Sequence, residues 1–134
     1  MGEIKVTYNG NLKTTATAGR SQITLSTDNS AGSREAGATY TPVDMFVTSL
    51  GACMLSMMGA AAARKGIDIE GATVAMSYDT DPDTHRVTAV RAAFDIPAEG
   101  LSEADRKVLM GAAKACPVGA SFREDIKKEL TFGF

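Results

Sequence analysis

The feature that most constrains this chain is an uncharged run near its centre, Met45–Ala63 (MFVTSLGACMLSMMGAAAA). It extends over about nineteen residues, the length that a transmembrane helix needs. However, the run is rich in Ala, Gly, Ser and Thr rather than in Leu, Ile and Phe, and it lies between segments with the pattern of strands. A helix that is apolar on all sides is otherwise one buried in protein. We therefore expect a buried central helix and no membrane association.

Residues on both sides of the run are those that begin and end helices. Thr41 can cap the helix, Pro42 suits its first turn, and Asp44 complements the positive end of the helix dipole. Arg64 would lie in the last turn, and Gly66 would end the helix. These signals predict a helix from about residue 42 to residue 65.

One face of this helix is expected to carry the first of two cysteines. Phe46, Leu50, Cys53 and Met57 recur at the spacing of a single helix face. A chain of 134 residues could hardly surround such an apolar helix by itself. Burial against a second copy of the chain would solve this problem, so we expect a homodimer.

The remaining elements follow from alternation and from turn residues. Ile4, Val6 and Tyr8 alternate with polar residues, which predicts a strand with these side chains inward, and Asn9-Gly10 predicts the turn after it. The expected strands are 3–8, 12–18, 22–27, 69–80, 86–96 and 129–134, and the further helices are 101–115 and 118–127. This order predicts one α+β domain over residues 1–134, with two helices against an antiparallel sheet.

Composition and charge exclude several classes of function. The net charge is −2 and no basic stripe is present, so nucleic acid is not an expected partner. The N-terminus lacks the apolar core of a signal peptide, and two distant cysteines suit a reducing cytoplasm better than a disulfide scaffold. His85 is the single histidine, there is no CxxC, and no Gly-rich phosphate loop occurs. We expect neither a metal nor a cofactor.

The two thiols are the residues with potential chemistry. Cys53, inside the long helix, could be a small buried hydrophobe. Cys116 precedes Pro117, a residue that suits the first position of a helix, so Cys116 would be the cap. Its sulfur would then face free backbone N–H groups and the positive end of a dipole, which favour a thiolate. The alternative is that Cys116 only fills a junction between helices.

Two motifs give the chain a resemblance to a known family. The first is Pro42–Phe46 (PVDMF) followed by Leu50–Cys53 (LGAC), and the second is Ala115–Ala120 (ACPVGA). Together they resemble the osmotically inducible protein C and organic hydroperoxide resistance family (OsmC/Ohr). The order of elements and the chain length also agree with it, so the resemblance covers essentially the whole chain.

The resemblance implies an intertwined homodimer with the long helices buried side by side. It also implies a thiol-dependent peroxidase for organic hydroperoxides, in which Cys53 is the peroxidatic thiol and Cys116 the resolving thiol. A dithiol reductant or a reducing protein would restore both thiols. The substrate pocket would be apolar, with Met54, Met57, Met58 and Phe122 among its residues.

In this family an Arg stabilises the peroxidatic thiolate and a Glu orients that Arg. By resemblance the Arg is Arg34, with Arg20 as the second candidate. The Glu position holds Val43 here, so Asp44 or Glu35 would have to replace it. This departure keeps two alternatives open, namely a small-molecule-binding dimer on the same fold and a redox-sensing dimer whose disulfide changes its shape for a partner.

Overall fold

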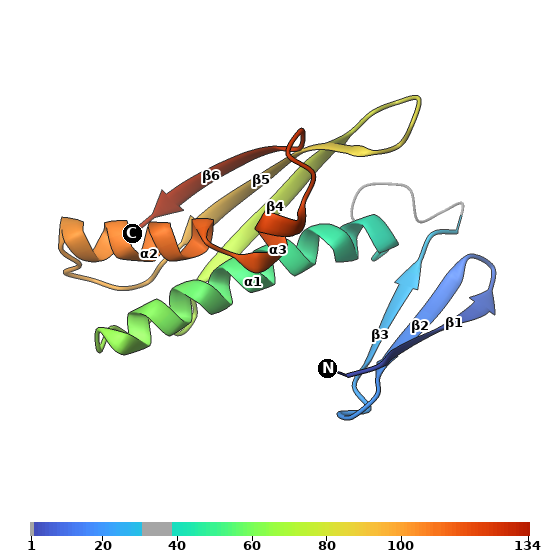
Figure 1. Ribbon diagram of the computed structural model, residues 1–134, viewed down its shortest axis with the longest axis horizontal. Coiled ribbons are helices and arrows are strands. Elements are labelled where there is room, and N and C mark those ends of the chain that lie inside the picture. Colours follow the sequence, from blue (N-terminus) through green and yellow to red (C-terminus); the bar gives the residue numbers. More distant parts are fainter. Residues whose placement is uncertain (1, 31–38) are drawn as a thin grey trace. The chain divides into compact units, whose positions relative to one another are not determined.

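The computed structural model describes residues 2–30 and 39–134, and it divides into two compact units, Met1–Phe46 and Val47–Phe134 (Figure 1). The first unit holds a three-stranded antiparallel sheet in the order β1-β2-β3. This sheet is formed by the first three predicted strands. Its strands are β1 (Ile4–Gly10), β2 (Lys13–Ala18) and β3 (Thr24–Asp28).

Two details of the first strand differ from the prediction. Ile4, Val6 and Tyr8 are 69%, 62% and 65% exposed, so the expected inward orientation is wrong for the single chain. Alternation identifies side chains that share a face, but it does not say what covers that face. The turn is also displaced from Asn9-Gly10, because β1 continues to Gly10. The left-handed residues of the turn are Asn11 (φ 54°) and Leu12 (φ 61°), a pair that matches strand twist in a two-residue hairpin.

Helix α1 (Pro42–Arg64) has both of its predicted ends. At the start, Asp44 N–H donates to Thr41 Oγ1 at 3.1 Å and Thr41 N–H donates to Asp44 Oδ2 at 2.9 Å, which is a reciprocal capping box. At the end, Gly66 adopts φ 68°, and Ile67 N–H donates to the Ala62 carbonyl at 2.9 Å. This closing pattern satisfies carbonyls that the helix itself leaves without partners.

The second unit packs helices on a mixed sheet, β4-β5-β6. Strands β4 (Thr73–Thr80) and β5 (Val87–Asp95) are antiparallel, whereas β5 and β6 (Lys127–Gly133) are parallel. The predicted antiparallel sheet is therefore corrected: the chain crosses over through α2 (Glu103–Lys114) and α3 (Pro117–Ser121) before β6, and a crossover returns a strand in parallel. Figure 1 shows α1 and α2 on the same side of this sheet.

The core lies between that side of the sheet and α1. The buried residues of α1 are Val47, Leu50, Gly51, Met54, Met58, Ala61 and Ala62. The buried face is thus rotated from the predicted one, because Cys53 and Met57 are half-buried at its edge and Phe46 is exposed. In the described part of the chain, α1 is the one helix long and apolar enough to cross a membrane, and 39% of its apolar window is buried within the protein.

The segment after Cys116 also differs from the prediction. Helix α3 ends at Ser121 instead of continuing to Lys127, because Phe122 is extended (φ −70°, ψ 150°). Phe122 and Ile126 are both buried in the core. The chain after Ser121 thus leaves the helical path and places both side chains in the core. The strand predicted to begin at Ile69 begins at Thr73.

Candidate redox site

The structure brings the two thiols together in the second unit. Cys53 is half-buried on α1, and Cys116 is buried, with 2% of its surface exposed, at the start of α3. Each is a free thiol. The two side chains are close enough for Cys53 to contribute to the raised pKa of Cys116, although they are far apart in the sequence.

Helix α3 positions Cys116 through its backbone. Cys116 is the N-cap residue, as predicted, and Pro117 follows in the first helical position. Gly119 N–H donates to Cys116 Sγ at 3.4 Å. Ala120 N–H donates to the Cys116 carbonyl at 3.0 Å, which closes the helical turn and fixes the sulfur at the helix start.

The pKa of Cys116 is shifted in the direction opposite to the prediction. Burial raises the pKa of this thiol, and the hydrogen bond to Cys53 raises it further. The backbone N–H groups of Gly119 and Val118 lower the pKa, as the cap position suggested, but they do not outweigh the other two causes. The pKa of Cys116 is therefore shifted upward overall, which favours its neutral S–H form.

Two glycines allow the elements around the thiols to approach closely. A Cβ atom on Gly51 of α1 would lie 3.1 Å from Met76 Cγ and 3.2 Å from Val74 Cγ1, so α1 rests directly on β4. A Cβ atom on Gly119 would lie 3.4 Å from Leu50 Cδ1, so α3 lies against α1. The glycines of the motifs LGAC and ACPVGA therefore have a packing role that holds the helices of the two cysteines together.

A lysine that the sequence analysis missed completes this cluster. Lys128 Nζ donates to the Gly119 carbonyl at 2.7 Å and lies 5.9 Å from the centre of the Phe122 ring. Lys128 has the same strand parity as Leu130 and Phe132, whose side chains pack against the core. This alternation along β6 is the sequence signal that could have identified it.

The side chains predicted to line a substrate pocket have different environments. Met54 is buried in the core, and Met57 is half-buried on the same helix. Phe122 is buried beneath Lys128. Met58 is buried in the core as well, so three of the four are core residues in the single chain.

The structure describes only some of the residues predicted to form the arginine–carboxylate pair. Arg34 and Glu35 lie outside the described residues. Arg20 is exposed in the turn between β2 and β3. Asp44 accepts the hydrogen bond of the α1 capping box, so its carboxylate has a structural role at the start of the helix.

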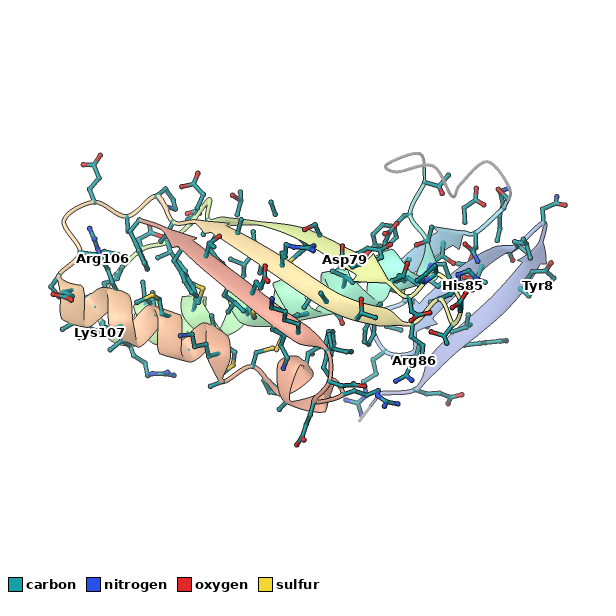
Figure 2. The ribbon with its side chains drawn as sticks, turned by 90° about the horizontal axis from the view of Figure 1, so that it is seen from above. Tyr8, Asp79, His85, Arg86, Arg106 and Lys107 are labelled. Atoms are coloured by element: carbon teal, nitrogen blue, oxygen red, sulfur yellow. The ribbon has the colours of Figure 1, made fainter. Side chains whose placement is uncertain are left out.

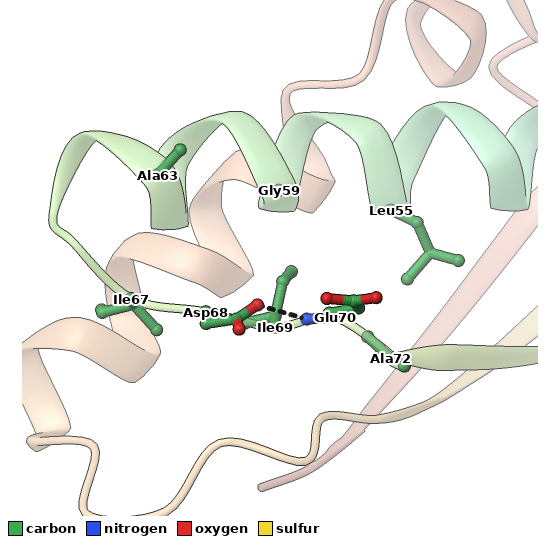
Figure 3. A pocket seen from close by; sticks show the side chains of 9 residues that line it. Leu55, Gly59, Ala63, Ile67, Asp68, Ile69, Glu70 and Ala72 are labelled. Atoms are coloured by element: carbon green, nitrogen blue, oxygen red, sulfur yellow. Dashed lines mark hydrogen bonds between the residues drawn. The ribbon is translucent and has the colours of Figure 1, made fainter.

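Two cavities of the second unit are lined by residues other than the predicted pocket residues. One of about 370 Å³ lies between the Leu55, Gly59 and Ala63 positions of α1 and the segment 67–72, where Glu70 N–H donates to Asp68 Oδ1 (Figure 3). Another, of about 580 Å³, is lined by Arg106 and Lys107 of α2 with parts of β6 (Figure 2). Neither includes a thiol. Within residues 2–30 and 39–134, no group of three or more His, Cys, Asp or Glu side chains could hold a metal ion.

Comparisons with known proteins identify the family and the fold. Residues 33–131 match the family of OsmC-like proteins. A crystal structure of a protein from Psychrobacter arcticus 273-4, provisionally assigned to osmotic stress and detoxification, superposes with a TM-score of 0.89 at 32% identity, covering 98% of this chain and 96% of that one. The comparison with curated protein sequences gave no match.

Two more distant structures share the fold. The organic hydroperoxide resistance protein OsmC of Legionella pneumophila has a TM-score of 0.68 at 19% identity, covering 100% of this chain and 97% of that one. The organic hydroperoxide resistance protein OhrB of Bacillus subtilis has a TM-score of 0.63 at 18% identity, covering 98% and 97%. Since the family match extends over most of the chain and a relative is 32% identical over nearly its full length, this protein belongs to the OsmC-like protein family.

Proposed function

We propose that this protein is a thiol peroxidase that reduces organic hydroperoxides with Cys53 and Cys116. The observation that carries the proposal is the closeness of the two free thiols, since α3 with Cys116 lies against α1 with Cys53. The names of the Legionella and Bacillus proteins, which describe organic hydroperoxide resistance on the same fold, support it. The coarser role, a part in peroxide resistance, is also consistent with the family.

The exposure of the two sulfurs supports different roles for them. Cys53 is half-buried and can meet a substrate, whereas Cys116 is buried behind it. In the proposed cycle the Cys53 thiolate attacks a peroxide oxygen, the O–O bond breaks, and the alcohol leaves with a proton. Cys53 is then a sulfenic acid, which condenses with the Cys116 thiol to give a disulfide and water.

The S–H of Cys116 suits this sequence of steps. The raised pKa of Cys116 keeps a proton on its sulfur until the disulfide forms. The same proton is available when the hydroxide of the sulfenic acid leaves as water. A dithiol reductant or a reducing protein would then return both cysteines to thiols by disulfide exchange.

The proposal includes a homodimer and a single OsmC-like domain over residues 1–134. In a single chain, one face of α1 is buried while Ser49, Ala52, Ser56 and Ala60 remain exposed on another. The β1 side chains Ile4, Val6 and Tyr8 are exposed as well. A second copy would remove this apolar surface from water, and burial of apolar surface contributes about 25 cal/mol per Å².

Arg34 remains the candidate for stabilising the Cys53 thiolate, with Asp44 as the carboxylate that orients it. The test compares Arg34→Ala with Arg20→Ala in peroxide consumption at several pH values. The proposal expects only Arg34→Ala to slow the reaction and to move its pH profile upward. An unchanged profile would exclude Arg34 from the site.

The central test follows peroxide consumption with a dithiol as reductant. Cys53→Ser should abolish the consumption of cumene hydroperoxide. Cys116→Ser should allow a single turnover and then accumulate a sulfenic acid that a dimedone probe captures. Normal cycling by Cys116→Ser would refute the resolving role, and normal cycling by Cys53→Ser would refute the proposed mechanism.

A second candidate function is ligand binding or redox sensing on the same dimer. Two observations favour it: Val43 stands where the family pattern has Glu, and Asp44 is engaged in the helix cap. Stable binding of a ligand without oxidation of either thiol would support binding. A disulfide that forms once and exposes new surface, without steady turnover, would support sensing.

A further inference from the structure

Lys128 is placed to act on the sulfur chemistry of the second unit. Its ammonium donates to the carbonyl of Gly119, the residue whose own N–H donates to Cys116 Sγ. One glycine thus bonds the lysine on one side and the sulfur on the other. Lys128 and Cys116 come from different elements, β6 and the start of α3, so their approach is a property of the fold.

The distances around Gly119 set an upper limit on the separation of the ammonium and the sulfur. The Cβ position of Gly119 lies 3.8 Å from Lys128 Nζ and 4.0 Å from Cys116 Sγ. The two atoms can therefore be no farther apart than the sum of these distances. Lys128 is exposed and Cys116 is buried, and a positive charge within this range stabilises a negative one on the sulfur.

A negative charge on Cys116 is required at one step of the proposed cycle. An external dithiol reaches the half-buried Cys53 sulfur more easily than the buried Cys116 sulfur. When its thiolate attacks Cys53 Sγ, a new S–S bond forms there, the Cys53–Cys116 bond breaks, and the electron pair stays on Cys116 as a thiolate. The second thiol of the reductant then attacks the mixed disulfide and releases Cys53, and the reductant leaves as a cyclic disulfide. The two protons of the dithiol are transferred to the two cysteines.

This leaving thiolate forms in an unfavourable environment. Cys116 is buried, and burial disfavours its charged form. A leaving sulfur that holds its charge poorly leaves slowly. The Gly119 and Val118 N–H groups stabilise the charge but carry no net positive charge themselves, so they supply no counter-ion.

We propose that Lys128 is a positioning residue for the reductive half of the cycle, which fixes α3 through the Gly119 carbonyl and stabilises the Cys116 thiolate as it leaves. The inference rests on the proposed function, because it assigns a role within the Cys53–Cys116 cycle. It goes beyond that function by naming a residue that determines how fast the oxidised protein is restored.

The test measures disulfide reduction separately from peroxide chemistry. Wild-type protein and Lys128→Met are oxidised with diamide, and their reduction by dithiothreitol is followed by stopped flow. We expect Lys128→Met to be reduced about tenfold more slowly, and Lys128→Arg, which keeps the charge, to recover most of the rate. The control is Lys127→Met, since Lys127 forms an ion pair with Glu129 at 2.9 Å and has the opposite strand parity.

A second measurement distinguishes charge from packing. In a Cys53→Ser background, alkylation of Cys116 with iodoacetamide is followed against pH, with and without Lys128→Met. The proposal expects the midpoint to rise when Lys128 is lost and to stay in place with Lys128→Arg. An unchanged midpoint, or equal reduction rates for Lys128→Met and Lys127→Met, would overturn it.

The outcomes also separate this inference from the proposed function. If diamide forms the disulfide and Lys128→Met slows its reduction while cumene hydroperoxide does not oxidise the protein, the role of Lys128 holds and the peroxidase proposal fails. If peroxide oxidises the protein and Lys128→Met is reduced normally, only the role of Lys128 fails. If diamide cannot form the disulfide, both are overturned.

Discussion

The close packing of α1 on β4 leads to a quantitative prediction for Gly51→Ala. The new methyl group would lie 3.1 Å from Met76 Cγ and Sδ and 3.2 Å from Val74 Cγ1. These distances are shorter than carbon contacts at optimal separation, which are about 3.5–4.0 Å. Either Met76 must move or α1 must shift away from the sheet.

Two opposing terms determine the result. Replacing Gly by Ala inside a helix adds about 1 kcal/mol of stability. Inserting a methyl group into a packed core costs about 1–3 kcal/mol. We therefore expect Gly51→Ala to lower the free energy of unfolding by up to about 2 kcal/mol.

Gly59→Ala and Gly111→Ala are matched controls. Both glycines are helical, and a Cβ atom on either meets no other atom within 4 Å. In these variants the free energy of unfolding should rise by up to about 1 kcal/mol, the gain expected from replacing Gly by Ala in a helix without crowding. The difference between Gly51→Ala and these controls therefore isolates the crowding at β4.

The assay is urea unfolding at one fixed protein concentration, because the stability of the proposed dimer would depend on concentration. Gly51→Ala should also slow disulfide formation between Cys53 and Cys116 if α1 shifts. If Gly51→Ala stabilises the protein as much as both controls do, the proposed close contact between α1 and β4 is wrong.

Three further predictions concern the helix cap and the thiols. Thr41→Ala removes one half of the capping box and should lower the free energy of unfolding by about 1 kcal/mol, measured by urea unfolding; no change would mean that the cap does not stabilise α1. Since the pKa of Cys116 is raised in the folded state, the folded protein keeps a proton that the unfolded chain releases. Its stability should thus fall as the pH rises above about 8.5, and fall less in Cys116→Ala; equal alkaline slopes would contradict this. In native protein at neutral pH, iodoacetamide should modify Cys53 well before Cys116, as peptide mass spectrometry would show, and equal rates would contradict the difference in burial.

Local features of the structure could be predicted well from the sequence. The capping box of Thr41 and Asp44, the terminal Gly66 and the cap at Cys116 each depend on a few neighbouring residues. Such features follow from backbone hydrogen bonds that the same short segment must satisfy. The thiol roles, by contrast, were inferred from a resemblance rather than from local chemistry.

Long-range packing accounts for what the sequence did not predict. The prediction of a low pKa for Cys116 took into account only the groups at the helix start. Burial and the distant Cys53 determine the direction of the pKa shift instead. Helix α3 was predicted too long because nothing near Phe122 in the sequence reveals that this ring is buried. Lys128 was missed because the partner of its ammonium is a backbone carbonyl, which has no sequence signature.

The most direct measurement for the proposed function is a count of free thiols before and after one equivalent of cumene hydroperoxide, with intact mass recorded under non-reducing conditions. The account predicts rapid loss of both thiols and a mass lower by two hydrogen atoms, as a Cys53–Cys116 disulfide requires. Two surviving thiols and an unchanged mass would contradict it.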